Sequence, residues 1–171
     1  MVPQNRPPVS VSAEFSWAAG ALRDTIFRAF VAAFQSSKIT KVYRCVKVSD
    51  INDPEHRDLC GLCLPTGESS YTLYIATTSY NAPQSEDEQV QTLIHELIHA
   101  VIVRAIGLTE NEESTTRKLE LALWHLFTPK QKRIIRTWLP EEILDHQPLP
   151  VEYMNGRLLG PGELTPSDPV L

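Results

Sequence analysis

The sequence predicts one α+β domain, with an N-terminal helix, a small sheet of about three strands and a helical C-terminal half. Two observations predict this class. Apolar residues recur at helical spacing near the start of the chain and again in its second half, and short alternating runs lie between them. With 171 residues, 42% of them hydrophobic, the chain is long enough to bury one core and short for two.

The domain is expected to span residues 12–146. Residues 1–11 are polar and contain several prolines, and residues 147–171 are rich in proline and glycine without a hydrophobic period. Segments of this composition bury too little apolar surface to fold alone. We therefore predict a flexible N-terminal tail and a Pro/Gly-rich C-terminal tail.

The first predicted element is an amphipathic helix over residues 12–34. Its apolar side chains follow one another at steps of three and four residues: Phe15, Ala19, Leu22, Ile26, Phe30 and Phe34. This spacing places them on one face of a helix, where they can be buried together.

Three short extended segments follow: residues 41–48, 59–64 and 71–76. The third is the clearest strand, because Leu73 and Ile75 alternate with Thr72 and Tyr74. The turn-forming residues 65–70 predict a hairpin that joins the second and third strands.

A second helix is expected to begin at Ser85 and to end near Gly107. Ser85 and Glu88 have the spacing of a capping box, and glycine is the common residue just beyond a helix C-terminus. Between them, the apolar positions again have helical spacing: Val90, Leu93, Ile94, Leu97, Val101 and Ala105.

Two further helices are predicted after this one. One starts between Thr109 and Asn111 and runs to Leu126. The other starts at Thr128, with Pro129 in the favoured first helical position, and stops before Pro140.

The helix predicted over residues 85–107 contains His95, Glu96 and His99 in the pattern His-Glu-x-x-His. Imidazoles four residues apart project from one helix face, so both can reach one zinc ion at roughly 2.0–2.1 Å. Glu96 stands beside the ion and can take a proton from metal-bound water, whose pKa zinc lowers towards roughly 7. A coincidental match to this pattern on a surface helix is the less favoured interpretation. The apolar neighbours of the histidines indicate burial, and buried imidazoles need partners.

A catalytic zinc needs a third protein ligand, and no third histidine follows at the distance used by metzincins. The candidates are acids of the next predicted helix: Glu110, Glu112, Glu113 and Glu120. A rotation of about 100° per residue places Glu112 within the apolar face of that helix, and Glu113 and Glu120 at its margin. We therefore expect Glu112 to be the ligand, with Glu113 and Glu120 as alternatives. Glu112 and Glu113 also suit a second interpretation, in which they only stabilise the helix N-terminus.

Residues 92–100 and the segments around them resemble short metallopeptidase-like proteins of phages and prophages, which are loosely related to the ImmA/IrrE group. The resemblance covers about residues 59–127. It depends on Gly61, the strand over residues 71–76, His95, Glu96, His99, Gly107, Leu108, Glu112 and Glu113. It implies a minimal zincin-like fold and gluzincin-like coordination of zinc by two histidines and a glutamate.

These features predict a zinc-dependent metallopeptidase-like hydrolase, with Glu96 as general base and a peptide or protein as substrate. We expect the peptide to add as a strand to a sheet edge near residues 71–78, where Leu73 and Tyr74 would affect KM. One alternative is a non-catalytic, metal-stabilised regulatory or binding protein of phage or prophage origin. Another is a hydrolase of non-peptide substrates, because the motif says little about the bond attacked.

Cys60 and Cys63 form a Cys-x-x-Cys unit, with Cys45 and His56 nearby in sequence. A structural zinc site or a redox pair would use this spacing, but a second pair and a thioredoxin-like context are missing. We therefore expect these cysteines to pack as small apolar side chains.

Charge and hydropathy exclude several classes of protein. The net charge is −5 and the basic residues are scattered, whereas nucleic-acid binding depends on clustered Lys and Arg. No apolar run approaches the roughly 20 residues of a membrane span, and residues 1–10 lack a signal-peptide pattern. We expect a cytoplasmic protein that binds neither nucleic acid nor membranes.

Overall fold

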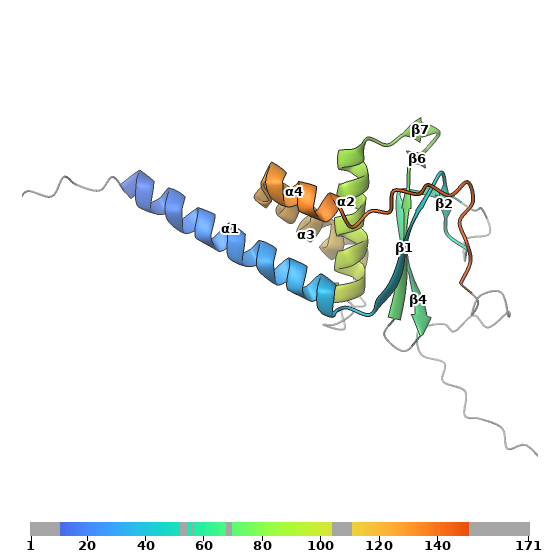
Figure 1. The fold of residues 1–171 in the computed structure, drawn as a ribbon, viewed down its shortest axis with the longest axis horizontal. Helices are drawn as coiled ribbons and strands as arrows, with labels where there is room; N and C mark the ends of the chain where they lie inside the picture. The colour runs from blue at the N-terminus through green and yellow to red at the C-terminus, as the bar shows by residue number, and fades with distance from the viewer. Residues whose placement is uncertain (1–10, 52–54, 56, 68–69, 104–110, 151–171) are drawn as a thin grey trace, which may run out of the picture.

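The computed structural model describes residues 11–51, 55, 57–67, 70–103 and 111–150. This part of the chain has an α+β fold, with four α-helices, a three-stranded sheet and two sheets of two short strands (Figure 1). The predicted class is therefore confirmed. Most of each predicted tail lies outside the described residues. None of the described helices combines the length and apolarity that a bilayer crossing demands.

The main sheet has the strand order β1-β5-β4. β1 (Ile39–Cys45) runs parallel to β5 (Ser70–Ala76), and β4 (Gly61–Gly67) runs antiparallel to it. The predicted hairpin between the last two strands is confirmed. β4 is an edge strand of this sheet.

The central position of β5 corrects one expectation. A peptide was expected to add to a sheet edge near residues 71–78, but β5 is paired on both sides, with β1 and with β4. Leu73 and Tyr74 are fully buried. That expectation is wrong because the sequence does not show which strand lies in the middle of a sheet.

The two faces of β5 belong to two different cores. Leu73 and Ile75 pack with the helices, and the alternating Tyr74 and Ala76 pack in a smaller cluster on the other face. The helical core also contains Phe27, Phe30, Leu93, Ile94, Leu97, Phe127 and Ile135. The predicted alternation along this strand is therefore confirmed, with both of its faces buried.

Two short sheets accompany the main one: β2 (Val48–Ser49) with β3 (Asp58–Leu59), and β6 (Thr78–Ser79) with β7 (Ala82–Pro83). Tyr80 and Asn81 form the two-residue turn of the β6–β7 hairpin, and both have positive φ. The chain continues from β7 directly into the next helix, so the hairpin lies beyond that helix's N-terminal end (Figure 1).

The described helices are α1 (Val11–Ser36), α2 (Glu86–Leu97), α3 (Glu112–Leu126) and α4 (Pro129–Arg136). α2 begins with the predicted capping box, in which the Ser85 N–H donates to Glu88 Oε2 at 2.6 Å and the Glu88 N–H donates to Ser85 Oγ. The Ser85 hydroxyl also donates to Glu88 Oε2, at 2.7 Å, and this bond together with that from the Ser85 N–H holds the pKa of Glu88 below its ordinary value. Thr128 and Gln131 form a second capping box at α4.

α2 does not continue as an α-helix to Gly107. A π-helix, η1 (Ile98–Val103), takes over after Leu97, and residues 104–110 lie outside the described part of the chain. Most of this segment is β-branched, and such residues have low α-helix propensity. Short π-helical segments are frequent at functional sites.

Residues near the predicted domain boundary contact the sheet. Leu144 forms a parallel bridge with Cys45. The Ser49 N–H donates to Gln147 Oε1 at 3.0 Å, and the Tyr74 hydroxyl donates to the Pro148 carbonyl at 2.7 Å. The first residues after position 146 thus hydrogen-bond to the domain.

Candidate metal centre

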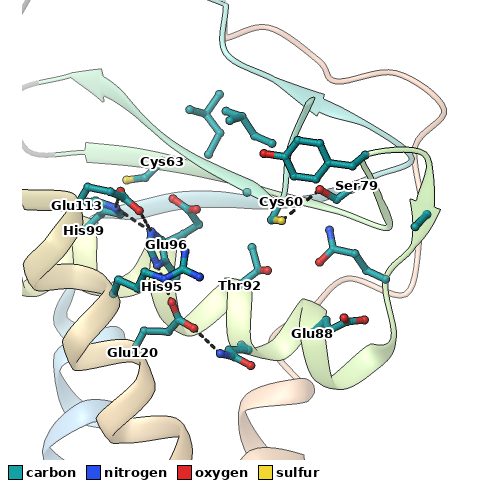
Figure 2. Close-up of a pocket in the computed structure, with 18 of the residues that line it drawn as sticks. Cys60, Cys63, Ser79, Glu88, Thr92, His95, Glu96, His99, Glu113 and Glu120 are labelled. Carbon is teal, nitrogen blue, oxygen red and sulfur yellow. Dashed lines mark hydrogen bonds and ion pairs between the residues drawn. The ribbon is translucent and has the colours of Figure 1, made fainter. Parts of the chain in front are cut away.

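A pocket of about 750 Å³ lies between β4, α2 and α3, with the β6–β7 hairpin at one end (Figure 2). Its lining includes both histidines of the motif and five carboxylates: Glu88, Glu96, Glu112, Glu113 and Glu120. The structure therefore brings every described candidate ligand to one cavity. Glu110 lies outside the described residues.

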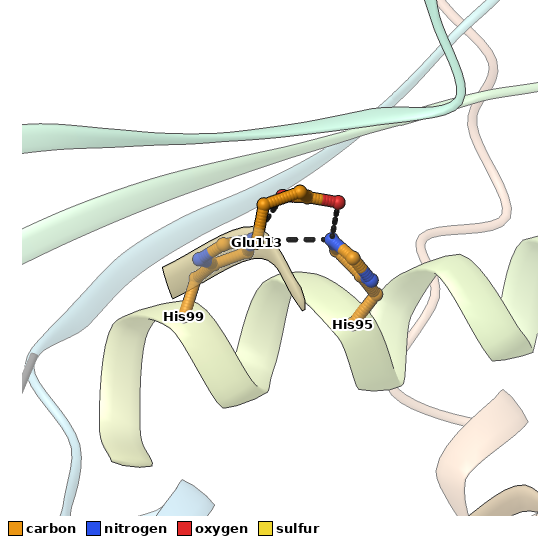
Figure 3. Close-up of side chains that lie close together, drawn as sticks. All are labelled: His95, His99 and Glu113. Atoms are coloured by element: carbon orange, nitrogen blue, oxygen red, sulfur yellow. Dashed lines mark hydrogen bonds and ion pairs between the residues drawn. The ribbon is translucent and has the colours of Figure 1, made fainter. Parts of the chain in front are cut away.

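Three side chains at this cavity converge on one point (Figure 3). His95 belongs to α2, His99 to η1 and Glu113 to α3. The two Nε2 atoms are 3.1 Å apart, and the Glu113 oxygens lie 3.4 Å from His95 Nε2 and 3.2 Å from His99 Nε2. This group could hold a metal ion.

Two further carboxylates bind the outer nitrogens of the histidines. Glu120 Oε2 lies 2.9 Å from His95 Nδ1, and Glu112 Oε1 lies 2.8 Å from His99 Nδ1. A carboxylate that accepts a hydrogen bond from Nδ1–H leaves the lone pair of a neutral ring on Nε2, which is the tautomer that a metal ligand needs. Metal-binding histidines commonly donate their other ring N–H to a carboxylate in this way, which fixes the tautomer and the ring orientation.

The inner atoms of the three side chains make contacts of 3.1–3.4 Å with one another. Both Nε2 atoms and the Glu113 carboxylate face the same small volume (Figure 3). Two ligands at roughly 2.0–2.1 Å from a tetrahedral zinc ion are about 3.3–3.4 Å apart, close to the three distances observed here. The donor set, two imidazoles and a carboxylate, also matches a catalytic zinc site. These residues fit a zinc ion.

Two further polar residues contact this arrangement, one at an outer carboxylate and one at a histidine. The Gln91 amide donates to Glu120 Oε1, and only 8% of Glu120 is exposed. Thr116 is fully buried, with its Oγ1 3.4 Å from His99 Nδ1. Sequence reasoning missed both Gln91 and Thr116. Gln91 precedes His95 by one helical turn, and this spacing was the available signal.

Glu96 lies in the same pocket but outside the ligand group, as the motif predicts. Only 6% of it is exposed. The backbone of β4 passes close to it, because a Cβ atom on Gly61 would lie 2.7 Å from Glu96 Oε1 and 2.6 Å from Thr92 Cγ2. Only glycine permits this approach of strand to helix.

The position of Glu112 differs from the ligand role expected for it. As predicted, its side chain points inward, with 29% exposed against 70% for Glu113. The Glu112 carboxylate contacts the outer nitrogen of His99, however, because the metal group lies at the margin of the apolar face of α3. Glu112 as ligand remains a prediction, and the geometry favours its alternative, Glu113.

The cysteines take no part in the metal group found among the described residues. Cys63 is buried in the core, as expected, and Cys60 is exposed with its thiol donating to Ser79 Oγ at 3.2 Å. Burial raises the pKa of the Cys45 thiol. His56 lies outside the described residues.

Comparisons with protein-family models, curated proteins and solved structures find no match. The resemblance to phage metallopeptidase-like proteins remains an expectation. The geometry of the pocket therefore carries the functional argument.

Proposed function

We propose that this chain is a zinc-dependent, metallopeptidase-like hydrolase of zincin-like fold, with zinc held by His95, His99 and Glu113. One observation carries the proposal: two imidazoles and a carboxylate converge within 3.1–3.4 Å, in a pocket that also holds a buried glutamate. When bound, zinc would supply Lewis acidity, which makes water a nucleophile near neutral pH.

Glu96 is the general base in this proposal. Its carboxylate lines the pocket beside His95, where it can accept a proton from the attacking water and return it to the leaving amine. Packing against Gly61 restricts its position. Glu112 and Glu120 keep the protons on the outer histidine nitrogens, so that both Nε2 atoms stay available as ligands.

A peptide substrate suits the shape of the site. β4 is an edge strand, and residues 60–63 at its start line the pocket above Glu96. A peptide that adds to this edge as a further strand would pass through the pocket. This proposed position of the peptide, at the edge of β4, replaces the position expected near residues 71–78.

The metal centre is tested by the zinc content of the purified protein, measured by plasma emission. We expect about one zinc ion per wild-type chain and none in His95→Ala or Glu113→Ala, because each loses a ligand. Glu112→Ala should retain zinc with weaker affinity, since Glu112 contacts only an outer nitrogen. Retention in Glu113→Ala with loss in Glu112→Ala would make Glu112 the ligand. A wild type that takes up no supplied zinc would refute the proposal.

The outer carboxylate Glu120 gives a separate prediction. Glu120→Ala is expected to weaken zinc affinity by about 10–100-fold, because His95 loses the partner that fixes its tautomer. Competition with a fluorescent chelator measures this affinity. Glu141→Ala, which removes an exposed carboxylate outside the pocket, should leave it unchanged. Equal affinities for the two variants would show that Glu120 has no positioning role.

A further inference from the structure

The turn of the β6–β7 hairpin holds an unfavourable residue. Tyr80 and Asn81 have φ values of 50° and 61°, the conformation of a type I′ turn. Asn, Asp and Gly adopt this conformation readily, and Asn81 therefore suits its position. A bulky aromatic residue such as Tyr80 is strained there.

The tyrosine side chain does not offset this strain through packing. It is 78% exposed and forms no hydrogen bond or ring contact with the described part of the chain. Tyr80 nevertheless lines the pocket that contains the metal group. Strained backbone of this kind is concentrated at active sites and ligand-binding sites.

Hydrogen bonds hold the hairpin firmly beside the pocket. The Cys60 thiol donates to Ser79 Oγ at 3.2 Å (Figure 2). Lys47 Nζ donates to Asn81 Oδ1 at 3.2 Å, and the Gln84 N–H donates to the Thr77 carbonyl at 2.8 Å. The hairpin is thus hydrogen-bonded to the segments that carry Cys60 and Lys47.

The hairpin leads into the first turn of α2, which lies about two helical turns from His95. It joins the N-terminal end of α2, where Glu88 lines the pocket, and His95 lies roughly 10 Å further along the helix at 1.5 Å per residue. An extended peptide covers that distance in about three residues at roughly 3.3 Å each. The pocket wall near the hairpin has apolar members: Leu59, Leu62, Ala82 and Pro83.

We propose that Tyr80 binds an apolar or aromatic side chain of the substrate, about three residues from the bond that is cut. The inference depends on the proposed peptidase function. The turn would then contribute to substrate selectivity, and this role gives a reason for a strained, exposed aromatic residue at the end of the pocket.

The test compares cleavage sites and thermal stability. A peptide mixture from a digested proteome is incubated with the zinc-loaded protein, and mass spectrometry records which residues flank each cut. Wild type should enrich apolar and aromatic residues about three positions from the cut. Tyr80→Asn should lower that enrichment by about two- to tenfold, the range for an aromatic contact. The same variant should raise Tm by about 2–4 °C, because asparagine relieves the turn.

Two variants serve as controls. Tyr80→Phe keeps the ring and should retain the enrichment, and Leu22→Asn, which alters an exposed apolar residue on α1, should not change it. An unchanged enrichment in Tyr80→Asn, or a lower Tm, would overturn the role of Tyr80 and leave the hydrolase proposal standing. Failure of zinc-loaded wild type to cut any peptide would overturn both.

Discussion

Replacing Glu96 with glutamine is expected to lower kcat for peptide hydrolysis by about 10²–10⁴-fold while the zinc content stays at one ion per chain. The amide keeps the size of the side chain in its buried site but cannot accept a proton from water. General-base catalysis contributes about this factor. The measurement pairs the rate of peptide cleavage with plasma emission on the same sample.

Glu86→Gln is the matched control, because it makes the same replacement at an exposed position on the same helix. Its hydrolysis rate should equal that of wild type. If Glu96→Gln cleaves peptides normally, Glu96 is not the base. If wild type and Glu96→Gln both bind zinc and neither cleaves, the metal-stabilised binding protein becomes the better interpretation.

Replacing Gly61 with alanine is expected to destabilise the protein and impair catalysis together. The added Cβ would lie 2.6–2.7 Å from side-chain atoms of Thr92 and Glu96, so these side chains or strand β4 must shift. Such overpacking costs about 1–3 kcal/mol of unfolding free energy, and a displacement near 1 Å at a catalytic group can cost about 100-fold in rate. Urea unfolding and kcat/KM measure the two effects.

Gly20→Ala gives the matched control. In α1, the added Cβ would have Arg23 Nη2 as its nearest neighbour at 3.7 Å, an ordinary contact. Alanine in a helix is favoured over glycine by about 0.5–1 kcal/mol, so this variant should be slightly more stable and equally active. If both alanine variants behave alike, the close approach of β4 to Glu96 is not required.

Local features of the fold could be predicted from the sequence. The capping boxes at Ser85 and Thr128 mark helix starts because their hydrogen bonds join residues three apart. The alternation around Leu73 likewise reports which face each side chain occupies. The strand order could not be predicted, since β5 pairs with β1 across more than 25 residues and alternation carries no information about pairing partners.

The candidate site likewise has one part that the sequence predicts and one part that it does not. His95 and His99 lie one turn apart, so their spacing is enough to place them on one face. Glu112 and Glu113 are adjacent and point about 100° apart, so the choice between them depends on how α3 packs against α2. That packing is a tertiary property, and the helical start assumed from sequence could not determine it.

The three converging side chains come from two separate stretches of the chain, the continuous α2–η1 segment and α3, and this origin links metal uptake to folding. An ion held by these side chains would act as a cross-link between the α2–η1 segment and α3, because Glu113 is 14 or more positions from each histidine. Zinc that binds only the folded chain would add about 4 kcal/mol of stability at a free concentration 1,000 times its Kd. The helical half would then unfold cooperatively with metal release, and the available zinc would control the lifetime of the protein as well as its chemistry.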